Sequence, residues 1–138
     1  MCGIFGYFSR SGQTLPPEKI AAMGAAILHR GPDDAGIYQA DGVALGNQRL
    51  SIIDIAGGHQ PFVSDDGAIV VVQNGEIFNH LELAAELNGT PFACRTHSDT
   101  EVLLRLYEQN GIAFLDKLNG MFALAILDRR AGARYPAR

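Results

Sequence analysis

Position 2 carries the residue best suited to covalent chemistry, a cysteine that directly follows Met1. Methionine aminopeptidases remove Met1 when a small residue follows, so we expect the mature chain to begin at Cys2. An N-terminal cysteine carries a thiol nucleophile and, in its α-amine, a base with a reference pKa of about 7.7–8.0. The thiolate is the attacking form, and this pairing needs no catalytic histidine. On position alone, a small buried cysteine without a catalytic role is the more frequent case.

A second candidate is the pair Asn74-Gly75, which follows the apolar run Ala68–Gln73. Cleavage of a carboxamide passes through a tetrahedral oxyanion that needs hydrogen-bond donors aimed at it. A side-chain amide and a backbone N–H at the end of a strand supply such donors. Asn-Gly is also the strongest short hairpin signal, so the pair taken alone favours a turn. The two interpretations are compatible.

Several segments resemble one enzyme family. Cys2-Gly3-Ile4-Phe5-Gly6 is similar to the start of class II glutamine amidotransferases. The segments that resemble the asparagine-synthetase branch are His29-Arg30-Gly31-Pro32-Asp33, Arg49-Leu50-Ser51-Ile52-Ile53-Asp54, Asn74-Gly75-Glu76-Ile77-Phe78-Asn79, Ser98-Asp99-Thr100-Glu101 and Met121-Phe122-Ala123. They occur in the expected order over nearly the whole chain, so the set is far more specific than any one segment.

The resemblance implies that glutamine is hydrolysed to glutamate and ammonia through a cysteine thioester. Cys2 would be the nucleophile, with Asn74 and Gly75 as the oxyanion hole. The implied glutamine-binding residues are Arg49, Leu50, Ser51, Ile52, Ile53, Asn74, Gly75, Glu76 and Asp99. Ile52 and Ile53 are equally compatible with a plain core role.

Arg49 and Asp99 suit the two poles of an amino-acid substrate. The planar guanidinium of Arg49 can grip an α-carboxylate with two hydrogen bonds. Asp99 can hold the α-ammonium group. Without the resemblance, Arg49 is a charge at a strand end, and Asp99 is an acid at a helix start where Ser98 and Glu101 form a capping box.

The elements that must position these residues follow from apolar periodicity. Strands are predicted at Gly3–Phe8, Gly36–Gln39, Val43–Gly46, Leu50–Ile55, Ala68–Gln73 and Met121–Leu127, and a turn-rich loop at 56–67. Helices are predicted from Pro16-Pro17 to a left-handed glycine cap at Gly31, over Leu81–Leu87, and from Ser98 to Asn110 with Gly111 ending it. This order indicates an α+β fold.

The resemblance implies an N-terminal nucleophile hydrolase fold, a four-layer αββα sandwich of two antiparallel sheets. We expect one glutaminase domain over residues 1–138, with its C-terminal part and the synthetase domain missing. After Asp128 a hairpin turn leads only to Ala133–Arg138, a short segment containing Pro136. We therefore expect the strand at Met121–Leu127 to keep an open edge.

Composition excludes several classes of function. The net charge is −4 with no clustered basic face, and no apolar run approaches the ~18 residues of a membrane span, so neither nucleic acid nor membrane is an expected partner. Two cysteines without an export signal indicate free thiols in the cytoplasm. The four histidines lack metal-ligand spacing, and segment 29–32 is interpreted as structural support for the cysteine loop. Cys94 is interpreted as a buried bystander.

We expect no cofactor in this domain. ATP and Mg belong to the missing synthetase domain or subunit, which would receive the ammonia and amidate aspartate. The expected partners are L-glutamine and that synthetase part, and a homodimer is allowed for. Two alternatives stay open: an inactive truncated remnant or binding fragment, and the glutaminase half of an amidotransferase with a different acceptor.

Overall fold

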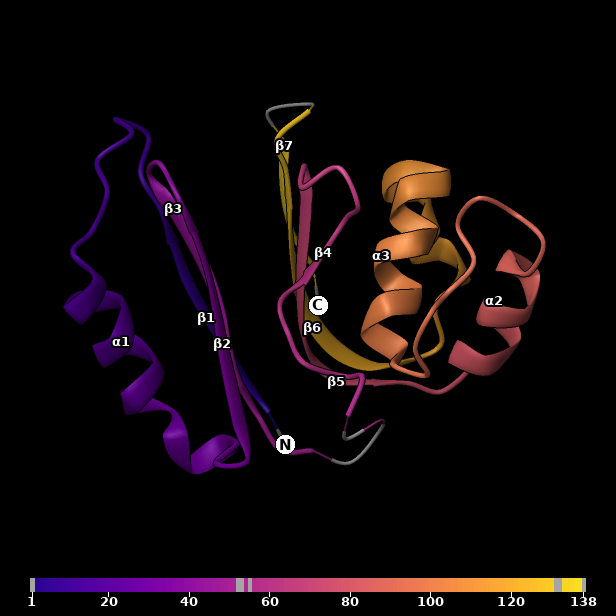
Figure 1. The fold of residues 1–138 in the computed structure, drawn as a ribbon, viewed down its shortest axis with the longest axis horizontal. Coiled ribbons are helices and arrows are strands. Elements are labelled where there is room, and N and C mark those ends of the chain that lie inside the picture. Colours follow the sequence, from indigo (N-terminus) through magenta and orange to yellow (C-terminus); the bar gives the residue numbers. More distant parts are fainter. Residues whose placement is uncertain (1, 52–53, 55, 131–132, 138) are drawn as a thin grey trace.

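Two antiparallel sheets stack face to face, and helices cover the outer face of each sheet (Figure 1). The computed structural model describes residues 2–51, 54, 56–130 and 133–137. The layers follow the order helix, sheet, sheet, helices, which confirms the expected four-layer α+β sandwich. Among the described residues, no helix has the length and apolar character needed to cross a membrane.

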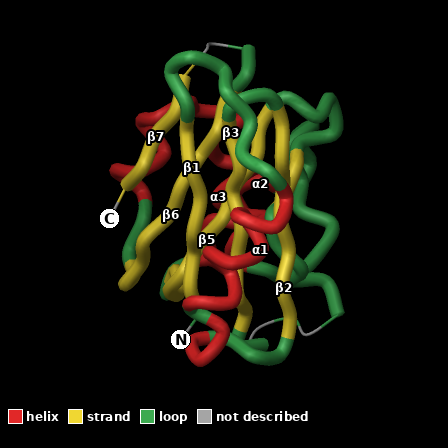
Figure 2. Tube along the Cα trace, turned by 90° about the vertical axis from the view of Figure 1, so that its left-hand side faces the viewer, coloured by secondary structure: helices red, strands yellow, loops and turns green. Residues whose placement is uncertain are grey.

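The first sheet brings the N-terminus next to the end of its central strand. Its strands are β1 (Gly3–Phe8), β2 (Asp34–Ala40) and β3 (Val43–Arg49), in the order β1–β3–β2. Gly3 lies opposite Gln48 in the antiparallel pairing of β1 with β3. This register places Cys2 beside the residues that follow β3. The helix α1 (Pro17–Ala26) and the short 3₁₀ helix η1 (Leu28–Arg30) lie against the outer face (Figure 2).

The second sheet is organised around one long antiparallel pair of strands, which the helices covering this sheet separate in the sequence. Its strands are β4 (Phe62–Val63), β5 (Ile69–Ile77), β6 (Gly120–Asp128) and β7 (Ala133–Ala137), in that order across the sheet. The ladder between β5 and β6 runs from Ile69 opposite Asp128 to Ile77 opposite Gly120. The helices α2 (His80–Leu87), α3 (Asp99–Asn110) and η2 (Gly111–Lys117) cover the outer face.

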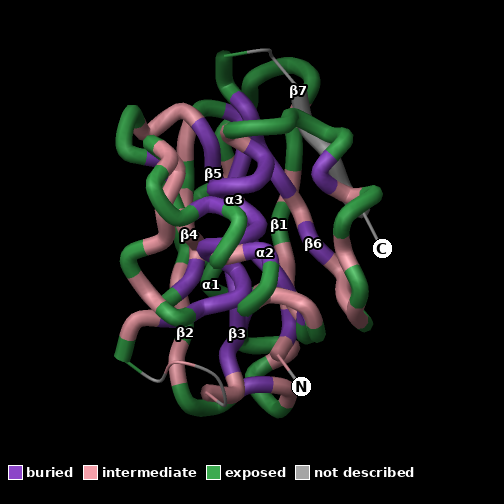
Figure 3. Tube along the Cα trace, turned by 90° about the vertical axis from the view of Figure 1, so that its right-hand side faces the viewer, coloured by how far each residue is buried: buried purple, intermediate pink, exposed green. Residues whose placement is uncertain are grey.

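The core has two parts, one on each face of β5. Ile69 and Val71 pack with residues of α2, α3 and β6, whereas Val70 packs with Val43 and Leu127 between the sheets. A strand that is buried on both faces needs an unbroken apolar run instead of alternation, which is why residues 68–72 read Ala-Ile-Val-Val-Val. Figure 3 shows β5 and α3 as buried segments near the middle of the molecule.

The first helix ends earlier than predicted. It stops at Ala26, and the residues around Leu28 form a 3₁₀ turn instead of a continued α-helix. Gly31 has φ −161°, which is extended backbone and not the left-handed cap that we expected. A Cβ at Gly31 would collide with the carbonyl oxygen of Gln48. Glycine is required here because two backbones approach closely.

The region after β3 also differs from the prediction. Leu50, Ser51 and Asp54 are not in a strand, and the remaining residues of the predicted strand, Ile52, Ile53 and Ile55, lie outside the described residues. The segment 56–67, predicted as loop, contains the two-residue strand β4. A strand this short carries no periodicity that a sequence pattern can reveal.

The expected open edge at β6 is wrong for residues 124–127. β7 pairs with β6 from Asp128 opposite Ala133 to Leu124 opposite Ala137. Pro136 lies opposite Ala125 within this ladder. An edge strand tolerates proline because the missing N–H faces away from the sheet. Over this stretch β6 is therefore an interior strand with a partner on each side.

We expect Phe114→Ala to lower the free energy of unfolding by about 3–5 kcal/mol, because a fully buried aromatic ring is replaced by a cavity. Phe114 is 0% exposed, and its ring meets that of Tyr107 edge-to-face with centroids 5.9 Å apart. Urea denaturation followed by circular dichroism measures the loss. Ile112→Ala is the control, since Ile112 is 44% exposed and should cost about 0.5 kcal/mol. Equal losses for the two variants would contradict this account of the core.

Candidate active site

A cavity of about 190 Å³ lies where β1 begins, β3 ends, β5 leaves the apolar core and α3 begins. Its lining combines residues that are far apart in the sequence. These are Cys2, Arg49, Leu50, Gly58, Gln60, Gln73, Asn74, Gly75, Glu76, Ser98, Asp99, Thr100 and Met121. All of the described residues that we predicted for the site, except Ser51, are among them.

Cys2 directly precedes β1 and is held there through its side chain and its backbone carbonyl. Its Sγ lies 3.4 Å from the backbone nitrogen of Leu50, which donates to it, and 3.6 Å from the carbonyl oxygen of Leu50. The Nε of Arg30 donates to the carbonyl oxygen of Cys2 at 3.1 Å. Segment 29–32 therefore supports the cysteine, as expected, but through Arg30, since His29 is exposed.

Arg49 is a buried cation at the end of β3, with 5% of its surface exposed. Its Nη2 donates to the carbonyl oxygen of Asp54 at 2.8 Å, and its Nη1 lies 3.9 Å from Oδ2 of Asp34. A Cβ at Gly58 would collide with this guanidinium group. The interpretation of Arg49 as a plain surface charge is therefore wrong, because the surrounding loop is shaped to enclose it.

Asp54 joins the loop around Arg49 to the start of α3. Its carboxylate accepts hydrogen bonds from the backbone N–H groups of Gly57 and His97, both at 2.8 Å. The bond from Gly57, the bond from His97 and the nearby charge of Arg49 all lower the pKa of Asp54. The carboxylate is therefore ionised at neutral pH and bridges the two sides of the cavity.

Asn74 and Gly75 lie inside β5, so the hairpin turn that the pair favours when taken alone is not formed. Asn74 is opposite Ala123 and Gly75 is opposite Phe122 in the ladder with β6. Gly75 has φ +141°, and a Cβ there would collide with the carbonyl oxygen of Met121. Only glycine fits on both grounds. The Oδ1 of Asn74 is buried and has no hydrogen-bond partner among the described residues.

Asp99 occupies the first turn of α3 and is 7% exposed. Its Oδ2 accepts hydrogen bonds from Nε2 of Gln73 at 3.0 Å and from the backbone N–H of Ile77 at 3.1 Å. Both donors belong to β5, so Asp99 is bonded across to the sheet. This position makes Asp99 part of the cavity and more than an acid that favours a helix start.

The capping box predicted around Asp99 is not formed. Ser98 does cap α3, because its Oγ accepts from the backbone N–H of Thr100 at 3.3 Å. Glu101, however, accepts from the backbone N–H groups of Arg95 and Thr96 at 2.7–3.0 Å. The N–H of Ser98 donates instead to Oγ1 of Thr96. Glu101 thus orders the turn that leads into the helix.

The remaining predicted residues fall into three groups. Glu76 lines the cavity and is exposed. Ser51 does not line it, and its backbone N–H donates to Oδ2 of Asp33 at 2.9 Å. Ile52 and Ile53 lie outside the described residues, so their predicted contact with glutamine stays a prediction.

Sequence reasoning missed six lining residues, which are Gly58, Gln60, Gln73, Ser98, Thr100 and Met121. Gln73 had a usable signal, since it is the one polar residue at the end of the apolar run 68–73. A glutamine at a position that is 1% exposed needs buried partners. Gln60 offered no such signal, because it belongs to a loop whose path depends on tertiary contacts.

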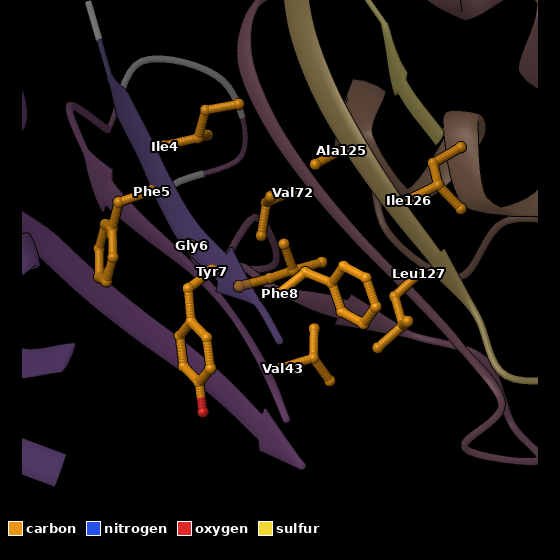
Figure 4. Close-up of a pocket in the computed structure, with 11 residues that line it drawn as sticks. Ile4, Phe5, Gly6, Tyr7, Phe8, Val43, Val72, Ala125, Ile126 and Leu127 are labelled. Carbon is orange, nitrogen blue, oxygen red and sulfur yellow. The ribbon is translucent and has the colours of Figure 1, made fainter. Parts of the chain in front are cut away.

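A larger cavity of about 340 Å³ lies between β1 and β6 and contains none of the predicted site residues. Figure 4 shows Phe8, Val43, Val72 and Leu127 pointing toward it, while the rings of Phe5 and Tyr7 point away. Its walls are apolar and carry no group that could perform hydrolysis. The candidate active site is therefore the cavity of about 190 Å³ that contains Cys2, and not the larger apolar cavity.

The described residues contain no group of three or more histidine, cysteine, aspartate or glutamate side chains placed to hold a metal ion. Both cysteines are free. Cys94 packs against the core, and burial together with the negative charge of Glu101 raises the pKa of its thiol to about 11, against the opposing effect of Arg105. A thiol with this pKa is a poor nucleophile at neutral pH.

Comparison with known proteins shows the family of the chain. A family model described as a glutamine amidotransferase domain matches residues 1–138. Asparagine synthetase (glutamine-hydrolyzing) 2 of Bacillus subtilis (strain 168) is 42% identical over 141 residues, covering 100% of this chain and 19% of its own length. Asparagine synthetase B (glutamine-hydrolyzing) of Escherichia coli (strain K12) is 42% identical over 134 residues, covering 96% and 24%. The chain thus spans about a fifth to a quarter of the length of these relatives.

Solved structures agree as well. Glutamine phosphoribosylpyrophosphate amidotransferase from Bacillus subtilis, in complex with ADP and GMP, superposes with a TM-score of 0.72 at 25% identity. The superposition covers 93% of this chain and 35% of that chain. A structure described as the allosteric regulatory enzyme of purine biosynthesis gives a TM-score of 0.74 at 24% identity over 93% and 36%, which supports the fold alone.

We expect iodoacetamide at pH 7.5 to alkylate Cys2 at least about tenfold faster than Cys94 in the folded chain, because only a small fraction of Cys94 is thiolate at that pH. Peptide mapping by mass spectrometry measures both rates. In urea the difference should largely disappear, since it originates in the folded environment. Faster labelling of Cys94 than of Cys2 in the native protein would refute the assignment.

We expect Gly75→Ala to cost at least about 3 kcal/mol of unfolding free energy, because backbone strain adds to the collision with Met121. Gly67→Ala is the matched control. Gly67 also has a positive φ, +71°, but no atom lies within 4 Å of its Cβ position, so strain alone should cost about 1–2 kcal/mol. Urea unfolding measures both, and an equal cost would argue against the close approach at Gly75.

Proposed function

The chain belongs to the glutamine amidotransferase domain family, and from that membership we propose that it hydrolyses L-glutamine to glutamate and ammonia. One observation carries the proposal: a single cavity gathers a thiol, a cation, an amide and two acids from separate parts of the chain. These residues are Cys2, Arg49, Asn74, Glu76 and Asp99, and Gly75 lines the same cavity beside Asn74.

Cys2 is the proposed nucleophile, with its α-amine as the base once Met1 is removed. The amine takes the thiol proton, and the thiolate attacks the carboxamide carbon of glutamine. Collapse of the tetrahedral intermediate forms a thioester and releases ammonia, which leaves with the proton returned by the amine. Water then cleaves the thioester, giving glutamate and restoring the thiol. The contacts of Sγ with the backbone of Leu50 support this role by fixing the thiol at the cavity wall.

Asn74 and Gly75 are the proposed oxyanion hole, through the side-chain amide of Asn74 and the backbone N–H of Gly75. Donors of this kind stabilise the charge that develops on the carboxamide oxygen. The Oδ1 of Asn74 makes no hydrogen bond with the described residues, so the amide can turn toward a substrate without breaking one. The collision that any Cβ at Gly75 would cause explains why this position carries no side chain.

Glutamine is a zwitterion, and the cavity has one group for each pole. We assign its α-carboxylate to the guanidinium of Arg49 and its α-ammonium to the carboxylate of Asp99. Glu76 is a further proposed contact at the exposed rim. The backbone of residues 50–53 completes the pocket in this proposal, with Leu50 at the lining.

The ammonia is proposed to serve the ATP-dependent amidation of aspartate in a synthetase domain or subunit, in the cytoplasm. The support is the similarity to asparagine synthetases along the whole chain. ATP and Mg would act in that synthetase part, and the glutamine hydrolysis proposed here uses only groups of this chain and water: the thiol and α-amine of Cys2, the side-chain amide of Asn74 and the backbone N–H of Gly75. An amidotransferase with a different acceptor would carry the same cavity.

We expect the purified 138-residue chain to release glutamate from L-glutamine, and Cys2→Ala to lower kcat/KM by on the order of 10³-fold or more, since the nucleophile is removed. Cys94→Ala is the matched control and should keep activity within about twofold, because Cys94 is a core residue with a raised pKa. A coupled glutamate dehydrogenase assay measures turnover, and intact mass reports whether Met1 is absent.

Turnover lost in Cys2→Ala and kept in Cys94→Ala would establish a cysteine glutaminase. A folded chain that lacks Met1 and still shows no turnover would refute autonomous activity and favour the remnant or binding fragment. Turnover that survives Cys2→Ala would refute the assigned nucleophile.

A further inference from the structure

We propose that Gln73, Thr100 and Gln60 form a directed hydrogen-bond chain that positions the Asp99 carboxylate for an α-ammonium group. The chain thereby makes the site selective for α-amino acids over carboxamides that lack the amine. This inference rests on the proposed function, because it assigns the ammonium pole of glutamine to Asp99. The three residues act through Asp99 and are positioning residues.

The hydrogen-bond chain begins at the backbone of Gln73 in β5, returns to the Gln73 side chain, and ends at Asp99 in α3. The backbone N–H of Gln73 donates to Oε1 of Gln60 at 2.7 Å, and Nε2 of Gln60 donates to Oγ1 of Thr100 at 3.1 Å. The hydroxyl of Thr100 donates to Oε1 of Gln73 at 2.9 Å. The Nε2 of Gln73 then donates to Oδ2 of Asp99 at 3.0 Å. Each of these four residues is at most 7% exposed.

The direction of every bond is forced by the first one. A backbone N–H can only donate, so the atom of Gln60 that faces it must be the amide oxygen, and the amide nitrogen must face Thr100. Thr100 accepts that bond and has one proton left, which it gives to the amide oxygen of Gln73. Gln73 must therefore turn its amide nitrogen toward Asp99. The opposite orientation would set an oxygen lone pair against a carboxylate.

The second donor to Asp99 comes from the same strand. The backbone N–H of Ile77 also donates to Oδ2, at 3.1 Å. Two fixed donors on one oxygen hold the carboxylate plane in place while the acid lines the cavity. Such pre-organisation lowers the entropy lost when a cation binds.

Helix docking alone does not explain these groups. α3 already packs on the sheet through Val102, Leu103 and Leu106, which share one cluster with Ile69 and Val71. Burying amides and a hydroxyl is unfavourable unless each is paired, and apolar residues would dock the helix without that demand. The polar chain therefore serves the one charged group at its end.

The test compares L-glutamine with glutaramate, which has the same carboxamide and a carboxylate but no α-amine. We expect Thr100→Val to lower the ratio of kcat/KM for glutamine to that for glutaramate by about tenfold, mainly through KM, because Gln73 loses the bond that orients it. Thr100→Ser keeps the hydroxyl and should keep the ratio within about twofold. Gln73→Leu, which removes the donor itself, should lower the ratio at least as much.

Tyr107→Phe is the matched control. It removes another buried hydroxyl from the same helix, one that donates to Oδ2 of Asp128 at 3.1 Å and lies two turns from Asp99. It should lower stability without changing the ratio. Calorimetric binding of glutamine and glutaramate to Cys2→Ala, with and without Thr100→Val, gives the same comparison without turnover.

An unchanged ratio in both Thr100→Val and Gln73→Leu, with wild-type glutamine turnover present, would overturn this inference and leave the proposed function standing. A ratio that falls equally in Tyr107→Phe would also overturn it, since the effect would then be general destabilisation. A wild-type chain that neither binds nor hydrolyses glutamine would overturn the proposed function and this inference with it.

Discussion

The position of the candidate site depends on a change along strand β5. The first half of β5 is buried on both faces, and the second half forms a wall of the cavity that contains Cys2. The strand is paired with β6 through both halves, from Ile69 to Ile77. Because side chains alternate along a strand, neighbouring residues reach different layers. Gln73 is bonded to α3, while the next residue, Asn74, belongs to the opposite face. The strand therefore places the cavity-lining residues 73–76 directly after the residues that it contributes to the core.

The cavity depends on close backbone approaches as much as on its polar side chains. Gly75 lies against Met121, and Gly31 lies against Gln48 near the end of β3. Gly58 makes room for the guanidinium of Arg49. In each case a Cβ would displace a neighbour that the site needs. These glycines are spacers that allow β1, β3, β5 and the loop after β3 to meet within one small volume.

Hydrogen bonds hold the two charged groups of the cavity, Arg49 and Asp99, and connect the elements that carry them. Arg49 bonds to the carbonyl oxygen of Asp54, and the carboxylate of Asp54 reaches the backbone N–H of His97 just before α3. Asp99, two residues further on, is tied back to β5 through Gln73. Arg49 is thus held by the backbone carbonyl of Asp54, and Asp99 by the side-chain amide of Gln73 and the backbone N–H of Ile77. Charged groups held in place in this way suit an amino acid, whose ammonium and carboxylate groups are a fixed distance apart.

Sequence alone supplied the candidate site residues and most of the elements. The candidates were Cys2, Arg49, Asn74, Gly75 and Asp99, and the elements include the strand at Gly3–Phe8. Such predictions depend on residue type and local periodicity, and both can be obtained directly from the sequence. Tertiary structure alone decided that Asn74-Gly75 continues a strand, since the partner β6 outweighs a local turn preference. It also decided that Gln60 and Thr100 reach Gln73, because contacts between residues 13–40 positions apart leave no local pattern. Glu101 bonds to Thr96, only five positions away, in place of the capping box that its spacing from Ser98 predicts.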